Sequence, residues 1–264
     1  MRPGSRRGST AALVGLLACA RAAAADPRPT RAHLIEHGVA TGGGVLIWML
    51  SETALKDRLA PSACSWCQPP AFDRYLRDHL RWRDPGAADT LSNVTAFVIA
   101  PGISLFGVAA VTGHRDGLYE GLDDVLAILE AGVTASLVDQ GIKFAVGRER
   151  PFVRYGDPAR PHQLDDDLSF FSGHTALAFA YATAGATVAS RRHLRAAPWI
   201  WAGGLGFAAT TGYLRIAADK HYLSDVAVGA LVGTGVGVLL PRLLHDHDVT
   251  VVPAPGGIAL LGTF

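Results

Sequence analysis

The sequence has little net charge, few cysteines and few stretches in which apolar and polar residues alternate. Its 264 residues include 24 Lys and Arg against 23 Asp and Glu, which leaves a formal net charge of +1. So small an excess argues against a nucleic-acid partner, since nucleic-acid-binding domains carry a strongly basic face. Because alternation with a period of two is rare, the sequence favours helices over half-buried strands. Without repeats or a long low-complexity linker, the chain suits one domain with a sizeable core.

Cysteine is scarce enough to restrict its role. The three cysteines are Cys19, Cys64 and Cys67. Only two residues separate Cys64 from Cys67, and in an exported protein such a pair most often forms a short disulfide. A redox or metal-binding role would need a surrounding redox fold or a second pair of ligands, and the sequence offers neither. The pair is therefore a candidate structural disulfide.

The first 25 residues have the pattern of an export signal. Three arginines among the first seven residues precede an apolar run from Ala11 to Ala20, and the small residues Ala23, Ala24 and Ala25 stand before Asp26. This order is typical of a cleaved secretory signal, and the apolar run is too short to span a bilayer comfortably. An alternative is a lipoprotein site, in which Leu16–Cys19 is the processing sequence and Cys19 is lipidated.

Six apolar segments have the length and spacing of long helices. They are Gly38–Leu55, Leu91–Val111, Leu122–Val146, His174–Ser190, Trp199–Ile216 and Tyr222–Leu244. Two prolines and a Gly-Gly pair in Val249–Phe264 predict two short strands. We therefore expect an all-α fold, a six-helix bundle that follows a signal segment and ends in a short β-like tail.

Three short clusters contain the residue types that can hold a phosphate group and attack its phosphorus. They are Lys143, Arg150 and Pro151, then Ser172, Gly173 and His174, then Arg215, His221 and Asp225. Lysine and arginine neutralise the phosphate oxygens, and N–H groups at a helix start add donors. One histidine can attack while the other protonates the leaving group.

The third cluster predicts the nucleophile. His221 and Asp225 are four residues apart at a helix start, so they lie on one face, one turn from each other. A carboxylate there can accept from one imidazole nitrogen and leave the other free to attack. Taken alone the pair would be read as a helix cap, but the other clusters favour His221 as nucleophile and Asp225 as its orienting partner. Arg215 would contact the phosphate.

The first two clusters predict the rest of the phosphate site. Ser172 is expected to cap a helix, Gly173 to let the backbone approach an anion, and His174 to act as general acid. Lys143 and Arg150 are seven residues apart, about two helical turns, so both can contact the phosphate from one side.

Two neighbours of these residues receive structural interpretations. Pro151 is expected to end the helix just after the two cations. Arg148, between them, is interpreted as part of a basic helix end favoured by the helix dipole.

The spacings Lys-x6-Arg-Pro, Ser-Gly-His and Arg-x5-His-x3-Asp resemble the signature of the type 2 phosphatidic acid phosphatase (PAP2) superfamily, which includes bacterial acid phosphatases and vanadium haloperoxidases. The resemblance extends over roughly Asp123–Leu244. The chain departs from the pattern at Phe171, where the family usually has Pro, and at Leu214, where it often has Ser. We divide the chain into a signal peptide (1–25), an N-terminal helix with a Cys-containing polar connector (26–90), a PAP2-like phosphatase core (91–247) and a tail (248–264).

The resemblance implies a phosphatase that hydrolyses phosphate monoesters, foremost lipid phosphates, through a phosphohistidine and without a metal or other cofactor. Two alternatives use the same residues. One is a haloperoxidase that binds vanadate on His221, and the other is a phosphotransferase that moves a lipid head group to an alcohol. The sequence does not name the ester. The runs Asp165–Asp167 and His245–Asp248 are interpreted as a polar loop and a solvated helix end, not as metal sites.

The export signal implies a site outside the cytoplasm, in a periplasmic or membrane-associated protein. Six full spans after a cleaved signal would instead put the motif loops on the cytoplasmic side. Asp124, Glu130 and Asp139 would also be costly in lipid. We therefore expect an exported bundle, soluble or resting on a membrane surface, with an integral membrane protein as the alternative because some segments are apolar enough to span.

Overall fold

The computed structural model describes residues 29–244, 250–254 and 257–261. The expected signal at 1–25, with Cys19, and the run His245–Asp248 lie outside the described residues. The described chain is mostly helical, as the sequence predicts. Near its end, β1 (Thr250–Ala254) and β2 (Gly257–Leu261) pair as an antiparallel hairpin in which Thr250 lies opposite Leu261.

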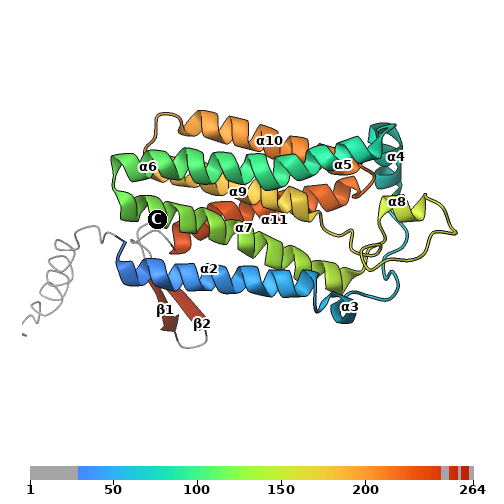
Figure 1. Cartoon of the computed structure of the whole chain (residues 1–264), viewed down its shortest axis with the longest axis horizontal. Helices are drawn as coiled ribbons and strands as arrows, with labels where there is room; N and C mark the ends of the chain where they lie inside the picture. Colours follow the sequence, from blue (N-terminus) through green and yellow to red (C-terminus); the bar gives the residue numbers. More distant parts are fainter. Residues whose placement is uncertain (1–28, 245–249, 255–256, 262–264) are drawn as a thin grey trace, which may run out of the picture.

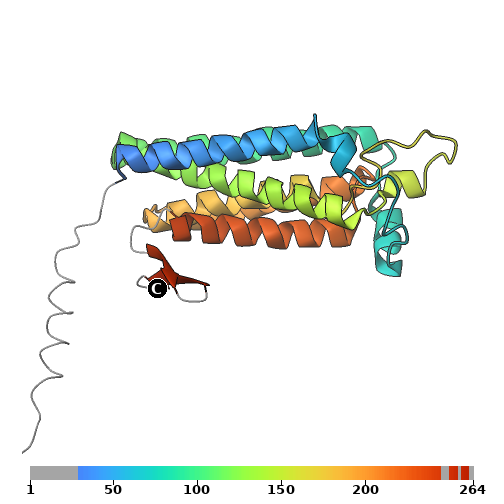
Figure 2. The same cartoon turned by 90° about the horizontal axis from the view of Figure 1, so that it is seen from below.

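Six long rods lie side by side in the described part of the chain (Figures 1 and 2). Five are single helices: α2 (Arg31–Glu52), α7 (Leu118–Val146), α9 (Gly173–Arg191), α10 (Ala197–Ala217) and α11 (Leu223–Leu244). The rod between α2 and α7 is assembled from α5 (Pro85–Val94), the π-helical segments η2 (Thr95–Ile99) and η3 (Gly102–Val108), and α6 (Ala109–Arg115). The predicted count of six helices is not confirmed, because this rod is composite and short helices are also present. These are α3 (Lys56–Leu59), α4 (Ala71–Leu80) and α8 (Pro151–Arg154).

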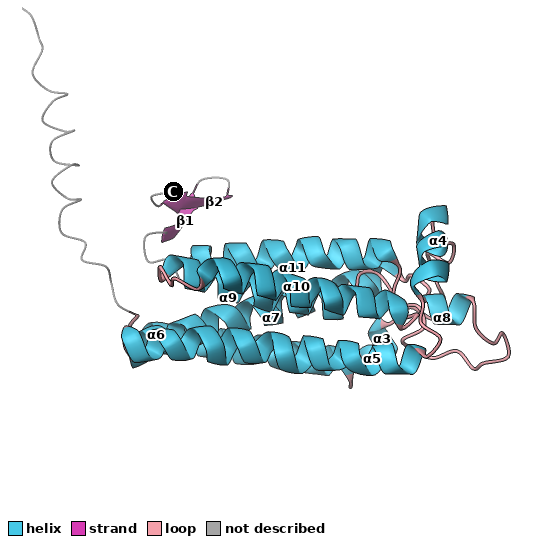
Figure 3. Ribbon diagram, turned by 90° about the horizontal axis from the view of Figure 1, so that it is seen from above, coloured by secondary structure: helices cyan, strands magenta, loops and turns pink. Residues whose placement is uncertain are grey.

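Successive rods run in opposite directions, so one end of the bundle gathers the connections after α2, α7 and α10 (Figure 1, right). We call this the loop end, and it comprises residues 53–84, 147–172 and 218–222. Figure 3 shows α4 and α8 at this same end. Because all three sequence clusters border these connections, the loop end is where they can meet.

The core is built on α9, which contacts α7, α10 and α11. Glycines on α11 let its backbone lie close to that of α9. A methyl group added at Gly229 would come within 2.7 Å of the Ser172 carbonyl oxygen, and one at Gly233 or Gly237 would overlap the backbone of α9. By contrast, an added methyl at Gly235 would meet nothing within 4 Å. Small residues spaced four apart therefore set the α9–α11 distance.

The outer faces of the rods are apolar and exposed. Leu46 and Ile47 on α2, Phe106 in η3, Trp199 on α10 and Leu231 on α11 are all more than half exposed. Four of the described helical stretches are long and apolar enough to cross a membrane, namely 31–52, 85–115, 118–146 and 223–243. An apolar outer face of this length is typical of a membrane protein.

The acidic residues of α7 no longer argue against a membrane. They were expected to be costly in lipid, but the structure turns them into the bundle, where each is buried and paired. The pairs are Asp124 with Arg192, Glu130 with His37, and Asp139 with Lys143, at 3.1, 2.8 and 2.8 Å. Inward-facing, paired charges are compatible with a membrane span. The structure therefore supports the integral-membrane alternative over the soluble bundle that the sequence favoured.

Candidate active site

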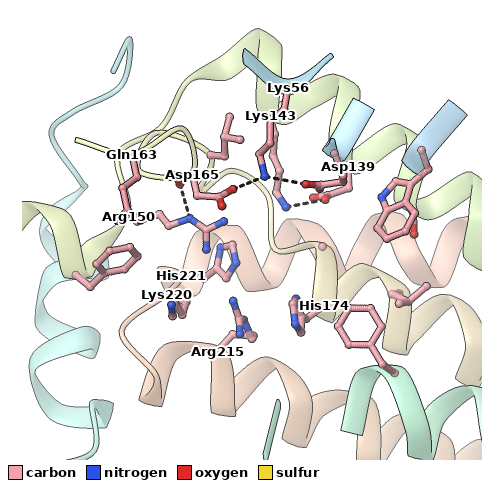
Figure 4. Close-up of a pocket in the computed structure, with 18 of the residues that line it drawn as sticks. Lys56, Asp139, Lys143, Arg150, Gln163, Asp165, His174, Arg215, Lys220 and His221 are labelled. Carbon is pink, nitrogen blue, oxygen red and sulfur yellow. Dashed lines mark hydrogen bonds and ion pairs between the residues drawn. The ribbon is translucent and has the colours of Figure 1, made fainter. Parts of the chain in front are cut away.

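The three sequence clusters meet at the loop end, around one cavity of about 360 Å³ (Figure 4). Six of the eight expected catalytic and phosphate-binding residues line it: Lys143, Arg150, Gly173, His174, Arg215 and His221. The other two, Ser172 and Asp225, are fully buried behind the cavity wall. Residues from α7, α9, α10 and the intervening loops are thus brought together at one place.

A left-handed turn at Gly147 carries the chain from α7 into the first cluster. Lys143 lies in the last turn of α7, and Gly147 follows the helix with φ 57°, a conformation that glycine adopts without strain. The predicted end of this helix at Val146 is confirmed, but Pro151, expected to stop the helix, instead opens the short helix α8. The extended backbone at Arg150 then lets its side chain reach the cavity.

The segment closed by the Cys64–Cys67 disulfide lies against this turn. The backbone N–H groups of Ser65 and Trp66 donate to the Gly147 carbonyl oxygen at 2.8 and 3.2 Å. The N–H of Glu149 donates in return to the Trp66 carbonyl oxygen at 3.2 Å. The disulfide therefore belongs to the loop end and supports the connection between α7 and α8.

His221 is buried in the loop between α10 and α11, with one ring nitrogen already engaged. Its Nδ1 lies 2.8 Å from the Ser169 carbonyl oxygen, so in the neutral ring Nδ1 carries the proton and Nε2 keeps its lone pair. Burial, and next the positive charges of Arg150 and Arg215, hold the pKa of His221 well below its usual value. The imidazole is therefore neutral at pH 7, the form that can attack phosphorus.

Asp225 contacts His221 mainly through the surrounding loop. Its Oδ2 lies 3.7 Å from Nδ1 of His221, beyond hydrogen-bond distance. The same oxygen accepts from the Ser169 hydroxyl at 2.6 Å and from the backbone N–H of Tyr222 at 2.8 Å. Because the carbonyl of Ser169 holds Nδ1 of His221, any orienting effect of Asp225 passes through Ser169.

Arg148 is the centre of a buried ion network, and its interpretation as part of a basic helix end is wrong. Its side chain is 1% exposed. It donates to Asp73 at 2.7 Å, to the Ser224 hydroxyl at 2.7 Å and to Asp225. Two nitrogens of one positively charged guanidinium thus face two carboxylates in a region closed to water. The network joins α4, the first cluster and the start of α11.

Two aromatic rings complete the surroundings of Arg148. Its guanidinium lies 3.9 Å from the centre of the Trp66 ring and 4.4 Å from that of Tyr222, as in a cation–π contact. The interpretation failed because α7 ends at Val146, so Arg148 lies beyond the helix whose end it was expected to form. Asp73 and Trp66 are too distant in sequence to have revealed the network by local spacing.

The start of α9 brings a close backbone approach to the cavity. Gly173 opens the helix, and a methyl group there would overlap the carboxylate of Asp139. Ser172 occupies the N-cap position as predicted, but its hydroxyl pairs with that of Thr175 at 2.8 Å. Ser172 therefore leaves the first N–H groups of α9 uncapped, as donors that an anion beside His174 can use.

Acceptors on α7 and in the loop before α9 hold the first two of the three predicted cations. Lys143 Nζ lies 2.8 Å from Asp139 Oδ2, and Arg150 Nε donates to the Asp165 carbonyl oxygen at 2.8 Å. Figure 4 shows Lys143, Arg150 and Arg215 arranged around His221. Three positive charges converging on one nucleophilic nitrogen suit a doubly charged phosphate group.

Helix α5 supplies three side chains to the site that the sequence analysis did not identify. The guanidinium of Arg215 donates to Asp89 and, at 3.0 Å, to the Ser92 hydroxyl. The Nε2 of His174 lies 2.7 Å from Asn93 Oδ1. These three residues lie far from their partners in the sequence, so no local pattern connects them.

Further cations line the same cavity. They are Lys56, Arg160 and Lys220, of which Lys56 pairs with Asp165 at 2.7 Å. Lys220 directly precedes His221, so its position next to the third cluster could have identified it. Among the described residues, no group of three or more His, Cys, Asp or Glu side chains is placed to hold a metal ion.

Comparison with known proteins identifies the domain. The model of the PAP2 superfamily matches residues 124–248, which include all three clusters. The lipid A 1-phosphatase of Porphyromonas gingivalis is 37% identical over 111 residues, which make up 42% of this chain. The chain spans only 21% of the length of that relative.

Two solved structures are similar to the whole bundle. A transmembrane PAP2-type phosphatidylglycerolphosphate phosphatase from Bacillus subtilis has a TM-score of 0.51 at 16% identity, covering 76% of this chain and 93% of its own. Aquifex aeolicus LpxE has a TM-score of 0.46 at 24% identity, covering 66% of this chain and 96% of its own. The similarity to the first of these structures shows that the helices share the fold of a PAP2-type protein. Residues 124–248 match the PAP2 superfamily, and the predicted resemblance is confirmed.

Proposed function

We propose that this protein is a metal-independent phosphatase that hydrolyses lipid phosphate monoesters through a phosphohistidine on His221. One observation carries the proposal: a single cavity holds His221, His174 and the three predicted cations. Phosphoryl transfer needs a nucleophile, a proton donor and positive charge around the transferring oxygens, and this cavity supplies each of them.

In the first step, Nε2 of His221 attacks phosphorus and the bond to the ester oxygen breaks. The cations Lys143, Arg150 and Arg215 stabilise the negative charge on the three non-bridging oxygens. His174, as imidazolium, gives its proton to the leaving oxygen, so that the alcohol departs neutral. In the second step His174 takes a proton from water, the hydroxide attacks phosphorus, and phosphate leaves His221. The site returns to its starting state without a metal.

An apolar cavity beside the phosphate site supports a lipid substrate. It has a volume of about 180 Å³ and lies among α2, η2, α7 and α9, with Val45 and Tyr181 in its lining. Trp48, Phe97 and Leu177 line both cavities. A phosphate held by the cations could therefore place an attached alkyl chain against apolar side chains. The exposed apolar faces of the rods likewise suit a protein that meets its substrate in a membrane.

The first test is phosphate release by the purified protein in detergent, with excess EDTA. We expect release from a lipid phosphate monoester to exceed release from a soluble sugar phosphate, with no loss on chelation. Vanadate should inhibit, since it mimics five-coordinate phosphorus. Dependence on a divalent metal would contradict the proposal. So would failure with every ester, and halide-dependent peroxide turnover or transfer to an added alcohol would then support the alternatives on the same residues.

We further propose that the loop end faces a compartment outside the cytoplasm. The start of α2 then lies in the cytoplasm, so this orientation sets aside the export of segment 1–25 that the sequence predicts. The Cys64–Cys67 disulfide lies there, and disulfides persist mainly in oxidising compartments. The basic connection Arg191–Arg195, between α9 and α10, lies at the opposite end of the bundle, which the positive-inside rule then places in the cytoplasm.

This orientation predicts that intact spheroplasts hydrolyse a phosphate ester that cannot cross the inner membrane. The rate should equal that of lysed spheroplasts within about twofold, because the cavity already opens toward the added ester. Spheroplasts that express the His221→Ala variant give the background from other phosphatases. Hydrolysis that appears only after lysis would place the site in the cytoplasm.

A further inference from the structure

We propose that Asn93, on α5, positions His174 for proton transfer and thereby takes part in the reaction, although it precedes the matched residues 124–248. The inference rests on the proposed phosphatase function. It adds a positioning residue that belongs to none of the three clusters, and it assigns the two nitrogens of His174 to different tasks.

The contact is short and specific. Asn93 Oδ1 lies 2.7 Å from Nε2 of His174. One turn further along the same rod, the ring of Phe97 meets the imidazole edge to face, with ring centres 4.8 Å apart and planes at 73°. The amide therefore fixes one nitrogen, and the phenyl ring restricts rotation of the imidazole plane.

A continuous face of α5 and η2 makes these contacts. Asp89 and Ser92 hold the guanidinium of Arg215, and Asn93 and Phe97 hold His174. The spacings of three, four and eight residues from Asp89 put all of these side chains on one side of a helix. The rod thus supports two groups that border the phosphate, and the Asn93 contact is part of that support.

The chemistry follows from the neutrality of the amide. When Nε2–H donates to Asn93 Oδ1, the proton that moves to the leaving group must come from Nδ1 of His174. A neutral acceptor fixes this arrangement without adding negative charge. A carboxylate in the same place would stabilise the imidazolium and make it a weaker acid.

Other charges also act on the His174 ring, from each element packed against it. They belong to Asp139 and Lys143 of α7, Arg150, Arg215 of α10, and Lys220 and His221 of the loop before α11. Most are positive and oppose a charged imidazole, while the negative charge of a bound phosphate would offset them. Changing Asn93 alone keeps this background constant.

The test compares two esters with the same phosphate and different leaving groups. An alkyl phosphate needs a proton on its departing oxygen, whereas 4-nitrophenyl phosphate does not. For Asn93→Ala we expect kcat/KM, which reports formation of the phosphohistidine, to fall about 10- to 100-fold with the alkyl ester. With the nitrophenyl ester it should fall less than about threefold. A structural defect would lower both values equally, and that result would overturn the proposal.

A second variant tests whether the neutrality of the Asn93 amide sets the acidity of His174. Asn93→Asp keeps the acceptor but adds charge, so the alkaline limb of the kcat/KM profile should move upward by about one pH unit. An unmoved limb would contradict the role. Thr90→Ala is the matched control, because Thr90 is also exposed on α5 and its hydroxyl bonds only within the helix, to the Gly86 carbonyl oxygen at 3.1 Å.

Failure of this inference is separable from failure of the proposed function. If the unaltered protein releases no phosphate, or if His221→Ala still does, the phosphatase proposal is wrong. If release depends on His221 but Asn93→Ala matches the unaltered protein with both esters, only the role of Asn93 is wrong.

Discussion

Replacing His221 by Ala is expected to abolish phosphate release while leaving the bundle folded. The variant loses the nitrogen that would bond to phosphorus, and no neighbouring side chain can take over its position. We expect kcat to fall at least about 10⁴-fold, as is usual when a covalent nucleophile is removed. The lost hydrogen bond to the Ser169 carbonyl should cost only about 1 kcal/mol, so the thermal unfolding midpoint should stay within a few degrees.

The experiment should follow both turnover and the intermediate. Protein quenched during turnover of a ³²P-labelled ester should carry label that is lost in acid and retained in base, and His221→Ala should carry none. His79→Ala is the control, because His79 is exposed on α4 and bonds to the Tyr75 carbonyl oxygen at 2.7 Å. Label on the His221→Ala variant, or turnover above about 1% of the original, would refute His221 as nucleophile.

Replacing Arg148 by Ala should produce the largest loss of stability at the loop end. The change would leave Asp73 and Asp225 buried without their shared cation. Removing one partner of a buried ion pair typically costs about 3–5 kcal/mol. Activity should fall as well, because Asp225 also holds Ser169, and Ser169 holds His221.

Arg154→Ala is the matched control for this prediction. Arg154 is 37% exposed and its nearest carboxylate, that of Glu149, lies 3.9 Å away, so its loss should change stability by less than about 0.5 kcal/mol. Thermal unfolding in detergent would compare the two variants. Arg148→Lys should recover little, since a lysine cannot reproduce the forked contacts or the stacking between Trp66 and Tyr222. Equal unfolding midpoints for the Arg148 and Arg154 variants would contradict the assignment of Arg148 to a stabilising network.

The two departures from the family pattern have different consequences in the structure. Leu214 is buried against Ala88 of α5, so it packs in an apolar cluster and does not reach the phosphate. Arg215 is held by Asp89 and Ser92 of α5. Phe171 is 1% exposed and fills the space behind the turn before α9. The cavity lining is therefore intact despite both differences.

The environment of the rods shows what composition cannot decide. The sequence lists acidic residues on α7 but does not say which way they point. In the structure Asp124, Glu130 and Asp139 face the bundle, and apolar side chains face outward. A count of charges per segment would be the same for either arrangement, so the sequence favoured a soluble bundle where the structure favours a membrane protein.

The sequence by itself determined the helical class, the three clusters and six of the residues that line the cavity. Each of these depends on residues that are close together in the sequence. Examples are two residues four apart, which lie one helical turn from each other, and a glycine at a helix start. Tertiary structure alone decided the burial of Arg148 against Asp73, the contact of Asn93 with His174 and the outward apolar faces. These depend on helices far apart in the chain meeting in space, and packing of whole faces, not local spacing, determines which helices meet.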